Sequence, residues 1–289
     1  MAVNKEGGFT DSYFLSVSVF LFFRGPTLRK GIAFWGGIWY TVGVVFFESE
    51  MAVKMDKSRQ GVWAKKYAPI ILNGLIFLLA VTGFLLSCIF AKRDGYSHWL
   101  TRLLYFTQQS NLWIGVTSLV FAVMLRKGNM TQKQTQIMSL LKYIFTVSIT
   151  VTGIVFCTLL APFAEEGIWT FAGVLTHVAV PVLAVADFFL NEHIGQIKKK
   201  HIWLSMIPPA LYFVFASILC VCKVDFGRGD PYPYFFMDYY SEVGLFGFVG
   251  EWPPQIGSFY WFVFFFVFIY GLGTLYYKWH TYAAERRKE

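Results

Sequence analysis

Charged residues are scarce in this chain. Asp, Glu, Lys and Arg make up 15% of its 289 residues, against 56% hydrophobic and 20% aromatic residues. This composition excludes a soluble domain of the same length. The net charge of +8 does not indicate nucleic-acid binding, because Lys and Arg stand in short clusters between apolar runs, as the topology signals of membrane proteins do. We therefore expect a multi-pass protein of the lipid bilayer with no nucleic-acid partner.

Cysteine is also rare, and the four cysteines form no CxxC pair and have no histidine close by in the sequence. Cys88, Cys157, Cys220 and Cys222 all fall in or at the end of apolar segments, which favours packing over disulfide or metal chemistry. We predict no metal and no organic cofactor. No GxxxG pair argues for helix dimerisation, and no inverted repeat argues for a transporter.

The first 66 residues contain two apolar runs, 13–23 and 31–47. The first is shorter than a membrane span and lacks the small-residue cleavage pattern of a signal peptide, and the second is of borderline length. Both are interpreted either as interfacial helices or as spans. This N-terminal hydrophobic extension, residues 1–66, is therefore kept apart from the core.

Six later segments are long and apolar enough to span a bilayer: 67–90, 103–125, 137–160, 168–190, 202–222 and 258–277. They predict an all-α integral membrane protein, in which a six-helix transmembrane bundle occupies residues 67–280 and a basic tail occupies residues 281–289. Basic residues cluster before the first segment, in alternate loops and in the tail. The positive-inside rule then places both flanks of the core in the cytoplasm, and the protein in the cytoplasmic (plasma) membrane.

The most unusual stretch is 105–113, where five consecutive polar residues enter an apolar segment. Thr107, Ser110 and Asn111 share one face of a helix, so they are expected to face other helices or a polar cavity. Asn73 is another intramembrane polar residue that is expected to join this network.

His177 stands inside the fourth apolar segment, four residues before Pro181. Proline removes a backbone donor, so we expect a kink beside the imidazole. Three interpretations stay open: a packing histidine hydrogen-bonded to a neighbouring helix, a catalytic base, and an ion or proton relay. Asp187 is expected to mark the cytoplasmic end of this segment, paired with Lys142 or with the cluster at Lys198.

These motifs, in order, resemble the prokaryotic six-transmembrane protein family, which is itself similar to the animal androgen-induced and androgen-dependent membrane hydrolases. The resemblance covers about residues 67–280. It is carried by the stretch 105–112, by His177 with Pro181 and Asp187, by 203–212 with Tyr212, and by 234–238 with Asp238.

The resemblance implies hydrolysis of fatty acyl esters without a cofactor. Thr107 would attack the ester carbonyl, and His177 would take its proton. Hydrogen-bond donors to the oxyanion would come from Gln108, Gln109, Ser110 or Asn111, with Asn111 preferred. Further pocket candidates are Asn73, Tyr212 and Asp238. The motif spacing differs from the animal pattern, and alignment on Asn111 and Pro181 would instead put Gln108 and Thr176 at the catalytic positions.

The alternative function is not enzymatic. In that interpretation Thr107, Asn111 and His177 line a pocket that binds a membrane lipid or another small amphiphile, or that conducts protons.

Overall fold

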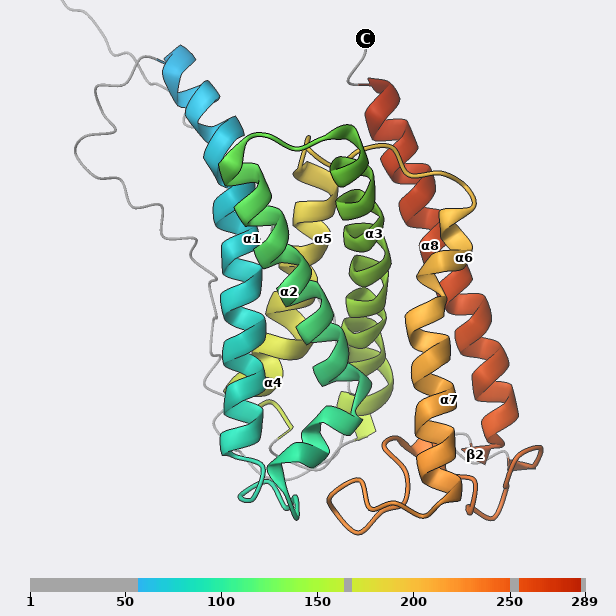
Figure 1. The fold of residues 1–289 in the computed structure, drawn as a ribbon. Coiled ribbons are helices and arrows are strands. Elements are labelled where there is room, and N and C mark those ends of the chain that lie inside the picture. Colours follow the sequence, from blue (N-terminus) through green and yellow to red (C-terminus); the bar gives the residue numbers. More distant parts are fainter. Residues whose placement is uncertain (1–56, 164–167, 250–254, 287–289) are drawn as a thin grey trace, which may run out of the picture. The chain divides into compact units, whose positions relative to one another are not determined.

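The computed structural model describes residues 57–163, 168–249 and 255–286. The apolar runs 13–23 and 31–47 lie outside these residues. The chain from Lys54 to Glu289 forms one compact unit, and its helices dominate Figure 1. In order, the principal elements are α1 (Lys57–Ile89), α2 (Phe106–Lys127), α3 (Gln132–Val155), α4 (Phe171–Val174), α5 (Val180–Leu190), α6 (His201–Ser205), α7 (Ile207–Val221) and α8 (Ser258–Arg286).

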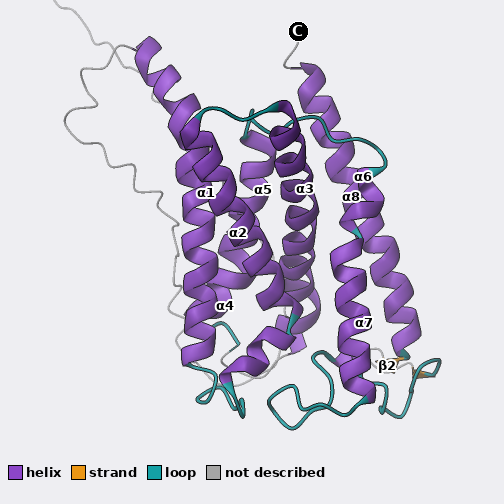
Figure 2. Ribbon diagram, viewed as in Figure 1, coloured by secondary structure: helices purple, strands orange, loops and turns teal. Residues whose placement is uncertain are grey.

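Shorter elements join or extend these helices. Two of them are π-helical turns. The first, η3 (Phe156–Leu160), extends α3, and the second, η5 (Leu175–Ala179), connects α4 to α5. Three 3₁₀ turns are η2 (Trp99–Leu104), η4 (Ala161–Phe163) and η6 (Phe235–Met237). Two-residue strands, β1 (Phe248–Val249) and β2 (Gln255–Ile256), pair antiparallel. Figure 2 shows that loops gather at the two ends of the helices.

Five helical segments in the described ranges are long and apolar enough to cross a membrane: Lys65–Ile89, Gln132–Leu160, Phe171–Leu190, His201–Val221 and Ser258–Arg286. They match five of the six predicted segments and confirm a multi-pass all-α membrane protein. The sixth is not confirmed. Its helix, α2, has 22 residues, but the polar run that begins at Thr107 lowers its mean hydropathy.

Successive long helical segments run in alternating directions (Figure 1). The start of α1, the α2–α3 connection, the α5–α6 connection and the end of α8 therefore lie at one end of the described unit. The predicted basic clusters gather at that end. The larger connection that carries η6 lies at the other end, below α7 in this view.

Proline accounts for two breaks in the helices. Pro181 stands in the first turn of α5, directly after the π-helical turn η5, where its missing N–H removes a helical hydrogen bond. Pro208 stands in the first turn of α7, after the helix has been interrupted at Met206. The irregularity predicted beside Pro181 is thus present as the turn η5, and a second break, at Met206, divides the next span into α6 and α7.

The buried core has two parts. Ile76, Ala80, Ile114 and Ala184 belong to a cluster at the meeting of α1, α2, α3 and α5. A larger, aromatic cluster joins α3, α7, α8 and the connection that carries η6. Residues of α2, α3 and α5 belong to both clusters, and the site described below lies beside α3.

Candidate functional site

The polar run at the start of α2 is largely buried, with Gln109 half-buried, and three of its members bond different neighbouring elements. Gln108 Nε2 donates to Ser87 Oγ of α1 at 3.4 Å. Ser110 Oγ pairs with Thr152 Oγ1 of α3 at 2.8 Å. Asn111 reaches η5, as described next. Ser110 and Asn111 thus face other helical elements, which is one of the two predicted arrangements, and together with Gln108 they join α2 to α1, α3 and η5.

Asn111 compensates for the break in the helix at η5. The N–H of Val180 bonds the carbonyl of Leu175 instead of that of Thr176, and the next residue is proline, which has no N–H. The Thr176 carbonyl is thus left without a helical donor, and Asn111 Nδ2 donates to it at 3.0 Å. The same amide group also donates to the Thr107 carbonyl at 2.8 Å. The Oδ1 atom of Asn111 is buried and has no hydrogen-bond partner among the described residues.

His177 bonds within its own helix. Its Nδ1 lies 2.8 Å from the Gly173 carbonyl and 3.1 Å from Thr176 Oγ1. Because a carbonyl only accepts, Nδ1 carries the hydrogen and Nε2 keeps its lone pair. The ring stacks on Phe156 of η3 with centroids 3.7 Å apart. Among the described residues, His177 and Thr107 share no hydrogen bond.

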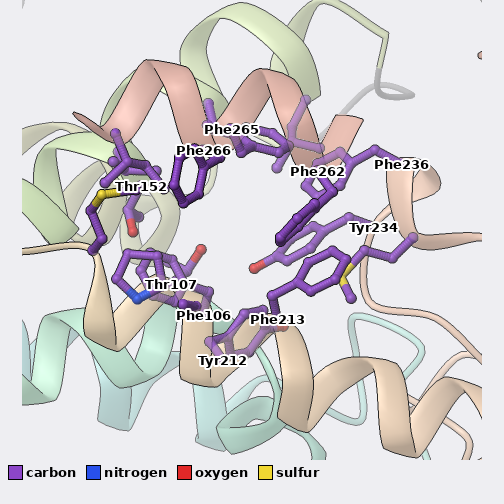
Figure 3. Close-up of a pocket in the computed structure, with 18 residues that line it drawn as sticks. Phe106, Thr107, Thr152, Tyr212, Phe213, Tyr234, Phe236, Phe262, Phe265 and Phe266 are labelled. Atoms are coloured by element: carbon purple, nitrogen blue, oxygen red, sulfur yellow. The ribbon is translucent and has the colours of Figure 1, made fainter. Parts of the chain in front are cut away.

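A cavity of about 120 Å³ lies between α3, α7 and α8, beside the start of α2 and closed at one end by the segment around η6 (Figure 3). It is lined by Phe106, Thr107, Val151, Thr152, Val155, Leu160, Met206, Pro209, Ala210, Tyr212, Phe213, Tyr234, Phe236, Met237, Phe262, Phe265, Phe266 and Ile269. None of these 18 residues is charged. The walls are therefore apolar and strongly aromatic, and hydroxyl groups are the chief polar side-chain groups on them.

The cavity reaches the lipid-facing side of α8. Phe262 and Phe266 line it while remaining 37% and 46% exposed. In Figure 3, Phe265 and Phe266 lie on the α8 side, opposite Thr107. A molecule in the bilayer can thus meet the same aromatic rings that line the interior.

Thr107 and Tyr234 form the polar corner of the cavity. Burial raises the pKa of the Tyr234 hydroxyl, while hydrogen bonds with the side chains of Thr107 and Tyr212 and with the backbone N–H groups of Thr107 and Phe106 lower it. The two N–H groups belong to the first turn of α2, where backbone donors have no helical acceptor. The Tyr234 hydroxyl thus accepts hydrogen bonds from free backbone N–H groups at the start of α2, although Tyr234 is distant from them in the sequence.

Two further predicted residues have structural partners. Tyr212 lines the cavity, and its hydroxyl donates to the Leu104 carbonyl at 3.0 Å. Asp238 does not line the cavity. Its Oδ1 accepts from the Tyr240 N–H at 2.9 Å, which closes a turn after η6.

Asn73 joins a different polar network from the one predicted for it. Lys142 Nζ and Asp187 Oδ2 form an ion pair of 2.7 Å in which both side chains are fully buried. Asn73 Nδ2 donates to Asp187 Oδ1 at 2.6 Å, and Lys142 donates to Asn73 Oδ1 at 2.9 Å and to Ser118 Oγ at 3.0 Å. Asn191 also donates to Asp187, at 3.1 Å. The expected pairing of Asp187 with Lys142 is thus confirmed.

Sequence reasoning missed several members of these sites. Tyr234 entered only through the resemblance, and the α8 rings Phe262, Phe265 and Phe266 were not predicted to line a pocket, although their i, i+3, i+4 spacing puts them on one helix face. Ser118 and Asn191 were not assigned to any network. Within the described ranges, no group of three His, Cys, Asp or Glu side chains is arranged to hold a metal ion.

Searches of protein-family models, of curated proteins and of solved structures find no match to this chain.

Proposed function

We propose that this membrane protein binds the hydrocarbon chain of a membrane amphiphile in the cavity between α3, α7 and α8. The observation that carries the proposal is a cavity without charged lining residues whose aromatic wall continues onto the exposed face of α8. Apolar, aromatic-lined pockets with a few convergent polar groups are typical ligand sites. The volume of about 120 Å³ is near that of apolar cavities of about 150 Å³ that stay dry and bind small hydrocarbons.

Photolabelling tests this proposal. The full chain in lipid nanodiscs is irradiated with an alkyl methyl ester that bears a diazirine in its chain, and crosslinked peptides are identified by mass spectrometry. We expect crosslinks in segments 206–213 and 262–269. Val155→Phe places a ring in the cavity and should lower this labelling about fivefold or more, because overpacking costs about 1–3 kcal/mol.

A neighbouring residue provides the control. Ile154 precedes Val155 on α3, is 36% exposed and does not line the cavity. Ile154→Phe adds the same kind of ring on the outer face and should leave labelling unchanged. Equal labelling of the two variants, or wild-type crosslinks spread evenly over all lipid-facing helices, would rule out the cavity as the binding site.

Hydrolysis of a fatty acyl ester is a second candidate, favoured by the presence of Thr107 in the cavity lining. In this reaction the Thr107 hydroxyl oxygen attacks the ester carbonyl, and His177 Nε2 accepts the proton and returns it to the leaving alcohol. This requires His177 Nε2 to come within hydrogen-bond reach of Thr107 Oγ1 when substrate binds. The resemblance to the six-transmembrane hydrolases likewise stays a proposal.

A fluorophosphonate probe separates the two candidates. An enzyme of this kind should be labelled in the wild type and unlabelled in both Thr107→Ala and His177→Ala at equal expression. Labelling that persists in both variants would exclude this pair as the catalytic residues.

We further propose that α2 is a sixth span, and that the end bearing the basic clusters faces the cytoplasm, in the cytoplasmic membrane. Support comes from the alternating directions of the helices and from the gathering of the basic connections at one end (Figure 1). The polar side chains of α2 do not oppose this, because Gln108, Ser110 and Asn111 all have partners inside the bundle.

A further inference from the structure

The cavity between α3, α7 and α8 has a closed inner end. Helices α3 and α7 run away from the end that bears the basic clusters, and α8 runs toward it (Figure 1). On each helix, the lining residue nearest that end is therefore Val151 of α3, Met206 at the start of α7 and Ile269 of α8. All three side chains are buried. Together they form the floor of the cavity.

Close packing fills the space behind the floor. The hydroxyl of Tyr143 donates to the Gly273 carbonyl at 2.8 Å. A Cβ at Gly273 would lie 2.7 Å from Ser205 Oγ and 3.2 Å from the Tyr143 hydroxyl oxygen. Gly273 follows Ile269 by one helical turn on the same face, and Ser205 directly precedes Met206. Helices α3, α6 and α8 thus meet behind the floor, and a chain cannot pass through it.

Aromatic rings close the opposite end and line the way to the bilayer. At η6, the Phe236 ring packs on Phe265 of α8 with centroids 4.8 Å apart. Between α7 and α8, the rings of Phe213 and Phe262 line the cavity with centroids 4.7 Å apart, and Phe262 and Phe266 are also exposed toward lipid. A ligand from the bilayer therefore enters sideways, past these rings, into a space with two closed ends.

The size of this space limits what it can hold. A cavity of about 150 Å³ accepts benzene, so a volume of about 120 Å³ holds about six carbon atoms of a chain. The lining positions on α8, from Phe262 to Ile269, extend over about 10 Å at 1.5 Å per residue. A lipid chain crosses one leaflet, about 15 Å of hydrocarbon. Such a chain is too long to fit in the cavity as a whole.

From these contacts we propose that the cavity binds the end of a membrane lipid chain, about six carbons, and that Ile269 is a specificity-determining residue that sets this limit. The proposal rests on the proposed function, because it names the part of the ligand that the same cavity takes. Ile269 lies near the middle of the segment 258–277, the depth at which the chains of one leaflet end. The remainder of the chain and the head group stay in the bilayer.

A series of methyl esters of increasing chain length tests the limit. Each ester competes with the diazirine-bearing ester for the full chain in nanodiscs, and its concentration is expressed as a mole fraction of the bilayer, so that a methylene left in lipid contributes nothing. We expect potency to rise about threefold per methylene while the cavity fills, because an empty apolar cavity is unfavourable in proportion to its volume. Potency should level off after about six carbons.

Ile269→Ala deepens the floor, so potency should level off about three carbons later, the number of carbon atoms removed. Val151→Ala deepens the floor from α3 without altering α8, and the expected shift is about two carbons. Val267→Ala is the matched control on α8, because Val267 is 64% exposed and does not line the cavity. Its potency should level off at the same chain length as in the wild type.

The outcomes separate this proposal from the proposed function. If Val155→Phe labels like wild type, binding in the cavity is itself refuted. If Val155→Phe blocks labelling but wild-type potency keeps rising with chain length, or levels off at the same length in Ile269→Ala and Val151→Ala as in the wild type, the cavity binds chains but the floor does not limit them. An equal shift in Val267→Ala would also refute the role of Ile269.

Discussion

Lys142 and Asp187 show how two charged residues, whose desolvation is unfavourable, are accommodated in an apolar bundle. Each charge has its opposite at 2.7 Å, and Asn73 contacts both side chains. Desolvation of two ions consumes most of their attraction, so such a pair adds little net stability. Loss of a single partner is different, because the remaining charge stays buried without compensation.

Lys142→Met should therefore lower the free energy of unfolding by about 3–5 kcal/mol, measured by SDS unfolding in mixed micelles. The exposed pair Lys65–Glu192, with side chains 75% and 58% exposed, is the control, and Lys65→Met should cost less than about 1 kcal/mol. Adding Asp187→Leu to Lys142→Met should recover part of the loss. Similar costs for Lys142→Met and Lys65→Met would contradict the compensation of charge described here.

Asp225, in the connection after α7, responds to pH. Its Oδ1 accepts from the N–H groups of Gly227 and Gly229 at 2.6 and 2.9 Å. These bonds stabilise the carboxylate and lower the pKa of Asp225 below its ordinary 3.8. Because the folded pKa lies below the unfolded one, the stabilisation is complete above pH 3.8 and is lost as pH falls through the folded pKa.

Hydrogen exchange of segment 225–230 measures this loss. After correction for intrinsic rates, protection should be constant above about pH 4 and should fall at lower pH. Asp225→Asn keeps an acceptor that does not titrate, so its protection should not change over the same range. A decline of equal size in both proteins would assign the effect to other groups.

At the scale of elements, η5 is tightly constrained by three helices that pack against it. Asn111 of α2 bonds its exposed carbonyl. A Cβ at Gly83 of α1 would lie 2.6 Å from Thr176 Cγ2, and one at Gly153 of α3 would lie 3.0 Å from the His177 carbonyl and 3.1 Å from Pro181 Cβ. Three helices thus approach a single irregular turn as closely as their atoms allow.

Gly153→Ala should destabilise the protein by about 1–3 kcal/mol, because the atoms its Cβ would meet are a backbone carbonyl and a proline ring, which cannot turn aside. Gly271→Ala in α8 is the control, since a Cβ there meets nothing within 4 Å. That substitution should be neutral or stabilising by up to about 1 kcal/mol from helix propensity. Equal losses in the two variants would show that the contact with η5 is not the cause.

At the scale of the whole molecule, the arrangement of the helices makes a topology prediction. Lys92 is exposed in the connection between α1 and α2, and Lys133 lies in the first turn of α3, directly after the α2–α3 connection. In a background without cysteines, Lys92→Cys should react with an impermeant maleimide in intact cells, and Lys133→Cys only after permeabilisation. Reaction of both from outside would show that α2 does not span.

The sequence predicts the spans well because a bilayer imposes length and apolarity on each one separately. It also indicates that α2 must turn polar residues toward partners. It does not predict which residues those partners are, because Tyr234 meets Thr107 only when the connection that carries η6 packs against the start of α2. The π-helical turn η5 is not predicted either. Pro181 indicates that a helical hydrogen bond is lost, but the sequence does not show that Asn111 supplies the replacing donor.

The Lys142–Asp187 pair has a consequence for biogenesis. Each charge sits in a segment that must enter the bilayer, where a lone charge costs up to about 2.5–3.5 kcal/mol during insertion, the value at the centre of a helix. The span containing Lys142 is made first, and its counter-ion Asp187 is the 45th residue added after it. We therefore expect the insertion machinery to retain the earlier helix until the later one arrives, so that the two enter lipid as a neutral unit.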